Sequence, residues 1–305
     1  MWVFNGRAGV AGLLLLGACE AQHASTGEEA LPEAAAVSAV AEAPQAEESS
    51  DRPAAPAKVY EVEDSFIKQF SEGHDYNWYK ADFAYMNNVQ RAGWEADHIL
   101  FDDSGVELMI TRERKEMCPF TGAEYQRRGR YHYGRYEIVM RAAPGSGIVS
   151  SMFTHTGPSQ GGDPHDEIDI EFLGHRTGEL HINYFTGGKA HGSVYVDLPY
   201  DAAEVYQLYA FEWDPDEIRW YVGDQLVYTA TAQDHPIPQT PGRWIQNIWT
   251  GSEGQYAWHG RPTFQSGATV GYQCASYLAA GDEGEQCSDT FSAGLPPVLL
   301  PAEQD

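Results

Sequence analysis

Residues 165–174 read His-Asp-Glu-Ile-Asp-Ile-Glu-Phe-Leu-Gly, and this stretch decides the expected fold. Its acidic residues Glu167, Asp169 and Glu171 alternate with apolar residues. A strict period of two predicts a β-strand, because successive side chains of a strand point to opposite faces of the sheet. One face of this strand would pack into a core, and the other would present three carboxylates in a row.

The row of carboxylates has structural interpretations as well as a chemical one. It could be a solvated strand face or a calcium site. Like charges on one strand face repel, however, and one strand cannot surround a cation that takes roughly 6–8 oxygen ligands. Two Glu side chains flank a shorter Asp, which suits proton sharing, and coupled carboxylates push each other's pKa values apart. The row is therefore predicted to carry acid–base chemistry.

The charge of the chain limits its partners. The 305 residues include 19 Lys and Arg against 45 Asp and Glu, a net charge of −26. This balance excludes nucleic acid, whose phosphates are bound by basic residues. A neutral polysaccharide is a compatible partner, and an aromatic content of 12% supplies rings for sugar stacking as well as for a core.

Residues 1–18 are predicted to be a signal peptide of the lipoprotein type. Arg7 precedes the apolar run 8–16, which is shorter than the ~20 residues that span a bilayer. The run ends in Leu-Gly-Ala-Cys at 16–19, which resembles a bacterial lipobox with Cys19 as the lipidated residue. An ordinary signal peptide is the alternative. Either way the protein is predicted to be exported, as a periplasmic or cell-surface lipoprotein or otherwise secreted.

The rest of the chain divides into three parts. Residues 19–57 are rich in Ala, Glu and Pro and predict a disordered linker, since they cannot bury enough apolar surface to fold. Residues 58–280 contain about a dozen short alternating runs with turn residues between them and no convincing amphipathic helix, which predicts one all-β sandwich or barrel. Residues 281–305 are predicted to be a polar, poorly ordered C-terminal tail.

Three further cysteines remain in the exported chain: Cys118, Cys274 and Cys287. An oxidising compartment favours disulfides, and three thiols allow three pairings. Cys274 and Cys287 are close enough in sequence to pair around the Gly- and Glu-rich loop between them, which would leave Cys118 without a partner.

The carboxylate row suits the hydrolysis of a glycosidic bond. That reaction needs an acid to protonate the leaving oxygen and a carboxylate on the other side of the anomeric carbon. Glu167 and Glu171 lie four residues apart, so their Cα atoms would be roughly 13 Å apart on a strand. Side chains leaning toward each other could reach the roughly 5–5.5 Å carboxyl spacing of retaining enzymes.

The sequence around this strand resembles the family 16 glycoside hydrolases, especially the lichenases (endo-β-1,3-1,4-glucanases). Glu-Ile-Asp-Ile-Glu matches the family's Glu-x-Asp-x-Glu motif, and similarity continues over 147–158, 181–188, 209–213, 218–222 and 247–249. The resemblance implies a β-jelly roll of two antiparallel sheets with a concave sugar-binding cleft. It implies Glu167 as nucleophile, Asp169 as its assisting partner and Glu171 as general acid/base.

The resemblance also implies substrate contacts and the absence of a catalytic cofactor. The implied contacts are Glu124, Gln126, Phe153, His155, His165, Asn183, Phe185, Asn247 and Trp249. A structural calcium ion, held mainly by backbone oxygens, is a further expectation. Laminarinase-like members carry an extra residue before the last Glu, as a β-bulge; its absence here predicts a regular strand.

Three departures from the lichenase pattern bear on the substrate and the disulfides. His155 stands where lichenases usually have Tyr, and His165 stands where they have Trp. Residues 164–167 are closer to bacterial depolymerases of exopolysaccharides such as succinoglycan. The cysteine expected near residues 91–94 as a partner for Cys118 is missing, so Cys118 would be free or abnormally paired.

These observations predict a retaining endo-acting hydrolase that cleaves internal β-glucosidic bonds of a β-1,3-1,4-glucan or related polysaccharide by double displacement. A transglycosylase or an exopolysaccharide depolymerase of the same fold is the alternative. A non-catalytic carbohydrate-binding sandwich is the alternative from another class.

Overall fold

The structure is a computed structural model that describes residues 58–300. The predicted signal peptide, the predicted linker and the predicted lipidation site Cys19 lie outside these residues, as do residues 301–305. Within the described range, no helix combines the length and the apolar character that crossing a membrane requires.

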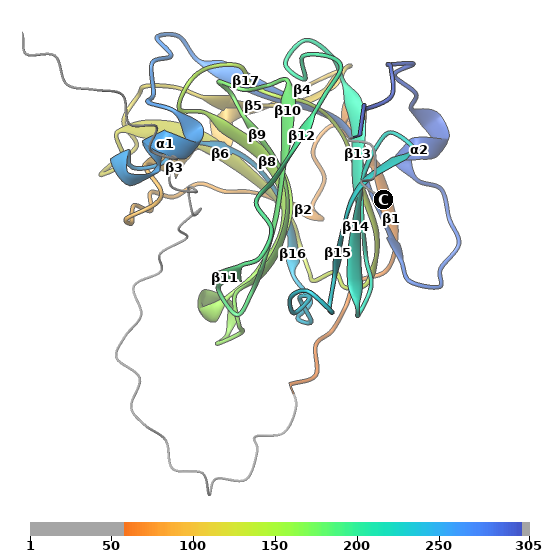
Figure 1. Ribbon diagram of the computed structural model, residues 1–305. Helices are drawn as coiled ribbons and strands as arrows, with labels where there is room; N and C mark the ends of the chain where they lie inside the picture. Colours follow the sequence, from red (N-terminus) through yellow and green to blue (C-terminus); the bar gives the residue numbers. More distant parts are fainter. Residues whose placement is uncertain (1–57, 301–305) are drawn as a thin grey trace, which may run out of the picture. The chain divides into compact units, whose positions relative to one another are not determined.

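Two large β-sheets make up the described chain (Figure 1). The sheet that contains the carboxylate strand, here called the cleft sheet, has the order β11-β10-β9-β8-β16-β6-β2, with β12 paired to β10 and β3 paired to β6. Its strands are β2 (Trp78–Lys80), β3 (Ala92–Trp94), β6 (Phe120–Arg127), β8 (Val149–Thr156), β9 (Asp166–Leu173), β10 (Glu179–Thr186), β11 (Lys189–Ala190), β12 (Val194–Asp197) and β16 (Arg243–Trp249).

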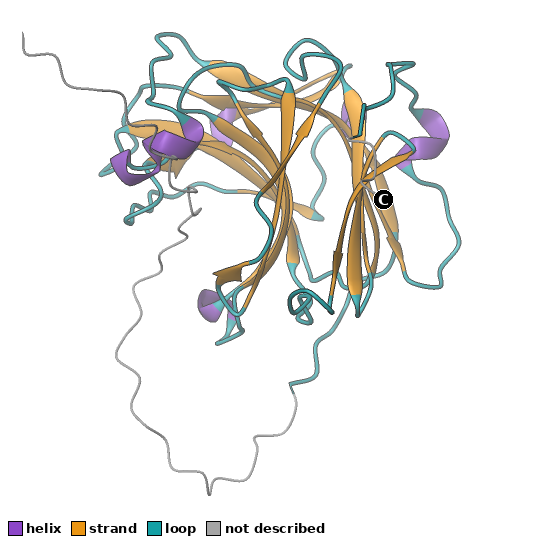
Figure 2. Cartoon of the chain, in the orientation of Figure 1, coloured by secondary structure: helices purple, strands orange, loops and turns teal. Residues whose placement is uncertain are grey.

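The second sheet, here called the back sheet, has the order β15-β14-β13-β7-β17-β5-β4, with β1 paired to β17. Its strands are β1 (Phe66–Gln69), β4 (Ile99–Asp102), β5 (Gly105–Ile110), β7 (Gly134–Arg141), β13 (Gln207–Trp213), β14 (Glu217–Val222), β15 (Gln225–Thr231) and β17 (Ala268–Ala279). Helices are short and lie outside the two sheets (Figure 2): η1 (Phe70–Glu72), η2 (Ala96–His98), η3 (Pro158–Gln160), η4 (Glu253–Gln255), α1 (Tyr256–His259) and α2 (Cys287–Thr290).

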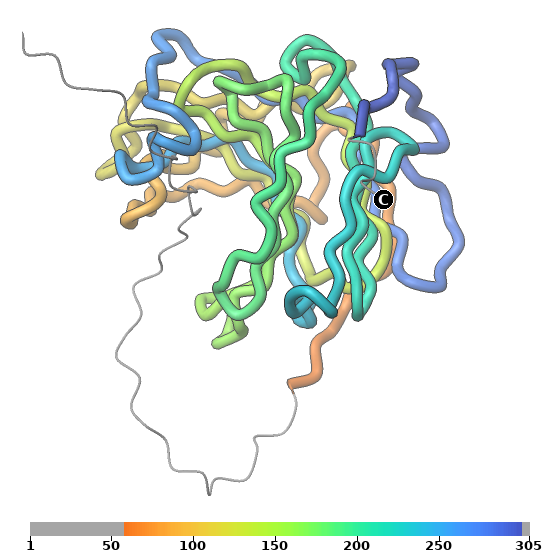
Figure 3. Tube along the Cα trace, viewed as in Figure 1, coloured from red at the N-terminus to blue at the C-terminus, as the bar shows by residue number. Residues whose placement is uncertain are grey.

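The predicted all-β jelly-roll sandwich is confirmed. Strands distant in sequence lie side by side, as β7 does with β17 and β8 with β16 (Figure 3). Pairing within residues 58–300 is antiparallel except between β3 and β6. The part of the chain that the structure describes has 17 strands rather than about a dozen. Pieces of two to four residues such as β11 become strands only through pairing with a neighbour, which a periodicity argument cannot detect.

The alternation in β9 places its apolar residues between the sheets. Ile168, Ile170 and Phe172 are at most 1% exposed and belong to the core. From the back sheet, Trp220 donates its indole N–H to the backbone oxygen of Asp169 at 3.1 Å, which ties the two layers together. Because the odd-numbered residues of β9 point the other way, its carboxylates face out of the sandwich.

The start of β9 is held by Asp166. Its carboxylate accepts hydrogen bonds from the backbone N–H groups of Gly187, Gln239 and Thr240 at 3.0, 3.2 and 3.1 Å. From there β9 pairs with β8 and β10 without a register shift. The predicted regular, unbulged strand is therefore confirmed.

Residues 281–300 contact the domain, so the prediction of a poorly ordered tail is wrong for this part of the chain. Cys287 in α2 forms a disulfide with Cys274 in β17. Farther on, the side chain of Gln225 and the backbone of Val298 exchange two hydrogen bonds of 2.8 Å, and Val298 is 4% exposed. A few anchoring residues suffice to order a segment whose average composition is polar.

Replacing both Cys274 and Cys287 with alanine is expected to destabilise the domain by about 3 kcal/mol, because the bridge closes a short loop and restricts the unfolded chain. The sequence separation of the two cysteines is 13 residues. The melting temperature should fall by roughly 5–10 °C. Calorimetry on the oxidised wild type and the double variant measures this; equal melting temperatures would contradict it. A Cys118→Ala variant is the matched control, since Cys118 is a free, buried cysteine.

Candidate active site

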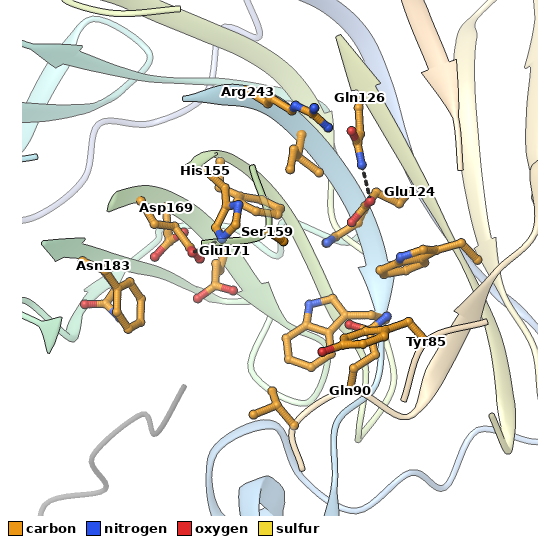
Figure 4. A pocket seen from close by; sticks show the side chains of 18 of the residues that line it. Tyr85, Gln90, Glu124, Gln126, His155, Ser159, Asp169, Glu171, Asn183 and Arg243 are labelled. Atoms are coloured by element: carbon orange, nitrogen blue, oxygen red, sulfur yellow. Dashed lines mark hydrogen bonds and ion pairs between the residues drawn. The ribbon is translucent and has the colours of Figure 1, made fainter. Parts of the chain in front are cut away.

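A cavity of about 690 Å³ lies over the outward face of the cleft sheet (Figure 4). Eleven of the twelve residues predicted for catalysis or substrate contact line it: Glu124, Gln126, Phe153, His155, Glu167, Asp169, Glu171, Asn183, Phe185, Asn247 and Trp249. They come from β6, β8, β9, β10 and β16, and all but the two residues of β6 have odd numbers. The outward face of neighbouring strands thus brings together residues that are far apart in sequence.

Strand register orders these side chains in rows across the sheet. Glu167 is paired with His155 on β8 and Phe185 on β10. The next rows are Phe153–Asp169–Asn183 and Ser151–Glu171–His181. Each carboxylate therefore has its own pair of cross-strand neighbours.

Asp169 and Glu167 share a side-chain hydrogen bond. Asp169 is 2% exposed, and its burial, together with the charges of Glu167 and Glu171, raises its pKa well above the ordinary value. Burial alone would raise the pKa of Glu167 too, but the hydrogen bond from His165, the nearby His155 and the hydrogen bond from Asp169 lower it overall. At neutral pH Glu167 is therefore an ionised carboxylate, and Asp169 donates a proton to it in a hydrogen bond.

His165 lies beside the Glu167 carboxylate and is not among the residues that line the cavity. A substrate contact at His165 stays a prediction. Its imidazole stacks on Phe185, with ring centroids 5.0 Å apart, and its Nε2 lies 2.6 Å from the Glu167 carboxylate. Burial alone would lower the pKa of His165, but this hydrogen bond and the negative charge of Glu167 raise it. The imidazole of His165 therefore both stacks on Phe185 and holds the Glu167 carboxylate.

A His165→Gln variant is expected to lose about 1 kcal/mol of unfolding free energy in a limited pH window, because glutamine keeps the hydrogen bond but not the charge. The raised pKa of His165 makes its contribution complete below pH 6.5 and lost as pH rises through the folded value. The lowered pKa of Glu167 makes its contribution complete above pH 4.5 and lost at lower pH.

Urea unfolding at pH 5.5 and pH 8.5 measures the difference, which should be large at the first pH and small at the second. His235→Gln, at an exposed histidine, is the control. A pH-independent loss would show that the charge of His165 contributes nothing.

Glu171 is held by a different histidine. His181 Nδ1 lies 3.0 Å from the Glu171 carboxylate, and His181 Nε2 lies 2.9 Å from the hydroxyl of Ser193. His181 is 1% exposed, so the pair is shielded from solvent on that side. Reasoning from the sequence missed His181, although it has the same parity as Asn183 and Phe185 and strand alternation would have placed it on their face.

A second acidic group lies farther along the cleft. Glu124 on β6 accepts a hydrogen bond from Gln126 at 2.5 Å (Figure 4), and Asn247 also hydrogen-bonds to it. Burial nevertheless raises the pKa of Glu124 to about 7. Ser151 in turn donates to Asn247 at 2.6 Å. Glu124 can therefore offer either a carboxylate or a carboxylic acid to a sugar hydroxyl near neutral pH.

Aromatic residues that the sequence did not assign form part of the cavity wall. Tyr85, Trp94 and Trp258 line the cavity together with Trp249, whose ring centroid is 6.1 Å from that of Trp258. Tyr85 and Trp258 belong to segments outside the strands, where alternation gives no signal. Aromatic faces stack on the apolar faces of sugar rings, so this wall suits a carbohydrate.

One group of side chains in residues 58–300 could hold a metal ion: His155, His165 and Glu167, whose donor atoms all lie within 4.8 Å of one another. Two imidazole nitrogens and one oxygen suit a transition metal and not calcium, which prefers an all-oxygen shell. This cluster is therefore not the expected structural calcium site, which would be held mainly by backbone oxygens.

Comparison with known proteins assigns the family. Residues 86–270 match the model of glycosyl hydrolases family 16. The chain is 41% identical to the beta-glucanase of Bacillus licheniformis over 188 residues, which is 62% of this chain and 75% of the relative.

Solved structures agree with the family match. A Bacillus licheniformis beta-glucanase structure superposes with a TM-score of 0.66 at 36% identity, covering 72% of this chain and 99% of that one. A beta-1,3-1,4-glucanase (lichenase) from a mouse hindgut metagenome gives a TM-score of 0.66 at 37% identity, covering 70% and 99%. With the three-carboxylate strand in its cleft, the chain is a glycoside hydrolase and belongs to glycosyl hydrolases family 16.

Proposed function

We propose that this enzyme hydrolyses internal β-glucosidic bonds of a β-1,3-1,4-glucan or a related polysaccharide with retention of configuration. The observation that carries the proposal is the row Glu167–Asp169–Glu171 on one strand face in an aromatic-walled cleft. The relatives named above are a beta-glucanase and a lichenase, which supports a β-glucan as substrate.

In the proposed mechanism the two glutamates exchange roles between steps. Glu171 protonates the leaving glycosidic oxygen while the Glu167 carboxylate attacks the anomeric carbon, which gives a covalent glycosyl-enzyme. Glu171, now ionised, then removes a proton from water, and that water displaces Glu167 with a second inversion. The hydrogen bonds of Asp169 and His165 keep Glu167 ionised and oriented before the attack.

The proposal is tested by incubating the enzyme with lichenan, laminarin, xyloglucan, agarose, carrageenan and succinoglycan and sizing the products. Cleavage of lichenan to short oligosaccharides, with the β-anomer appearing first by NMR, is the expected result. An α-anomer would contradict retention, and inactivity on every β-glucan would contradict the substrate class. Products longer than the substrate in the presence of an added acceptor would favour transglycosylation instead.

We also propose export and lipidation, which rest on the sequence of residues 1–19. Cys19 would carry the lipid and anchor the enzyme to a membrane. Mass spectrometry of the mature N-terminus tests this directly. Acylated Cys19 and membrane fractionation are expected, with release of a Cys19→Ala variant into the soluble fraction; a mature chain that starts elsewhere would contradict it.

A structural calcium ion held by backbone oxygens is a further proposal. If one is bound, treatment with EDTA should lower the melting temperature, and added CaCl₂ should restore it, because a ligand that binds only the folded state stabilises it. Identical melting curves with EDTA and with millimolar calcium would exclude such a site.

A further inference from the structure

A second pocket, of about 250 Å³, adjoins one end of the cleft. It is here called the arginine pocket, and it is lined by Tyr79, Gln126, Arg127, Arg128, Gly129, Arg130 and Arg243. Tyr79, Gln126 and Arg243 also line the main cavity, so the two spaces share a wall. Figure 4 shows Arg243 and Gln126 side by side, beyond Glu124.

The charge of this pocket is opposite to that of the chain. Four of its seven lining residues are arginines and none is acidic, in a chain with 19 basic and 45 acidic residues. Clustered guanidinium groups repel one another unless an anion lies among them. Guanidinium also binds carboxylates in a planar, bidentate geometry. The cluster is therefore arranged for an anionic ligand.

One of the arginines, Arg130, is engaged within the protein, and Arg128 is engaged only in part. Arg130 forms a 2.6 Å ion pair with Asp163 and a hydrogen bond to the backbone oxygen of Pro241. Arg128 donates its Nε–H to the backbone oxygen of Tyr76 at 2.9 Å, although its other nitrogens stay available.

The other two arginines have no ion pair, although Arg127 hydrogen-bonds to Tyr131 and the charge of Arg243 acts on Glu124. Arg243 is exposed, and no carboxylate of residues 58–300 forms an ion pair with it or with Arg127. The guanidinium of Arg127 packs 3.8 Å from the ring centroid of Phe66, and its buried Nε has no hydrogen-bond acceptor within the described chain. Glu63 packs against Gly129 at the rim, and with Asp163 it offsets part of the positive charge but not all of it.

We propose that the arginine pocket binds a carboxylate substituent carried by the β-glucan substrate. The inference rests on the proposed function and narrows its substrate class to a β-glucan with scattered acidic groups. Strand register gives the position: Arg243 is paired with His155, which is paired with Glu167. Two strand spacings place the Arg243 backbone about 10 Å from that of Glu167.

At this distance from each other, the carboxylates and the arginine pocket prefer opposite charges on the substrate. Near Glu167, Asp169 and Glu171 a carboxylate on the sugar would be repelled, so the sugar at the cleaved bond is neutral. At the arginine pocket the same carboxylate is attracted. The enzyme therefore takes a substituted polysaccharide and not a uniformly anionic one.

The test compares kcat/KM on a β-1,3-1,4-glucan with kcat/KM on the same glucan after partial oxidation of its C6 hydroxymethyl groups to carboxylates. The full chain is used at low and at high salt. Wild type is expected to prefer the carboxylated glucan at low salt, and salt should reduce this preference because it screens exposed charges. Arg243→Gln and Arg128→Gln, both at exposed side chains, are each expected to lower the preference about fivefold.

Arg112→Gln is the matched control, since Arg112 is an exposed arginine outside both cavities, and it should leave the preference unchanged. Binding of both glucans to a Glu171→Gln variant, measured by calorimetry, gives a second readout that does not need turnover. Cleavage of both glucans with no preference in rate or binding would contradict carboxylate binding in the arginine pocket and leave the proposed function intact. If neither glucan were cleaved, the proposed function would fail, and the binding preference would still decide whether the pocket takes a carboxylate.

Discussion

A Glu171→Ala variant is expected to lose on the order of 10³-fold in kcat/KM on polysaccharide, since general acid catalysis contributes about 10²–10⁴-fold. The loss should be much smaller on an aryl β-glucoside oligomer with a dinitrophenyl leaving group, because such a leaving group departs without a proton. Azide should then restore turnover and give a β-glycosyl azide, since the anion attacks the glycosyl-enzyme in place of activated water. Steady-state kinetics and NMR of the azide product measure both effects.

A matched variant is Glu179→Ala, which removes a glutamate from β10 that pairs with Arg176. It should keep the activity of wild type. Equal losses on both substrates in Glu171→Ala would show that Glu171 does not act as the acid, and wild-type activity on polysaccharide would exclude it from the reaction.

A Glu167→Ala variant is expected to show a still larger loss, roughly 10⁴-fold or more, on both kinds of substrate, because the covalent intermediate cannot form. Here azide should enter the vacated space, attack the anomeric carbon directly and give an α-glycosyl azide. Opposite anomers from the two variants would assign the two glutamates, since one displacement inverts and two retain. A β-product from Glu167→Ala would falsify its role as nucleophile.

The same variant has a consequence for pH dependence. Asp169 has a raised pKa because it is buried between two carboxylates. Removing Glu167 removes one of these charges and one hydrogen-bond acceptor, so the pKa of Asp169 should fall toward its ordinary value. This coupling explains why an Asp between two Glu residues suits the site. Asp169 holds a proton and donates it in a hydrogen bond to Glu167, so Glu167 can stay ionised next to it.

His155 and His165 stand at positions that bear on which substrate the cleft accepts. Lichenases usually have aromatic rings at both positions, and the structure shows what the change does. His165 turns to Glu167 and stacks on Phe185, whereas His155 lines the cavity, 3.8 Å from the Glu167 carboxylate. Burial, the dominant effect, lowers the pKa of His155, and the raised pKa of His165 keeps the proton there. The cleft therefore presents a neutral imidazole to the sugar.

The sequence by itself determined the fold class, the position of the carboxylate strand and which of its residues share a face. Period-two alternation is a local property, so the outward face of Glu167, Asp169 and Glu171 and the inward face of Ile168 and Ile170 could be read from ten residues. The resemblance to family 16 then named eight further residues that line the cleft.

Only the tertiary structure decided which of these groups are charged and what lies beside them. The raised pKa of Asp169 depends on its burial in the folded protein and on the charges of Glu167 and Glu171. The contact between His165 and Glu167 likewise exists only in the folded protein. Trp258 reaches the cleft from outside the strands. The arginine pocket combines residues of β2, of β6 and the segment after it, and of β16, and β16 lies more than a hundred positions along the chain from the other two. Burial and cross-strand proximity arise from long-range pairing, and a local pattern carries no information about which distant side chain will complete a site.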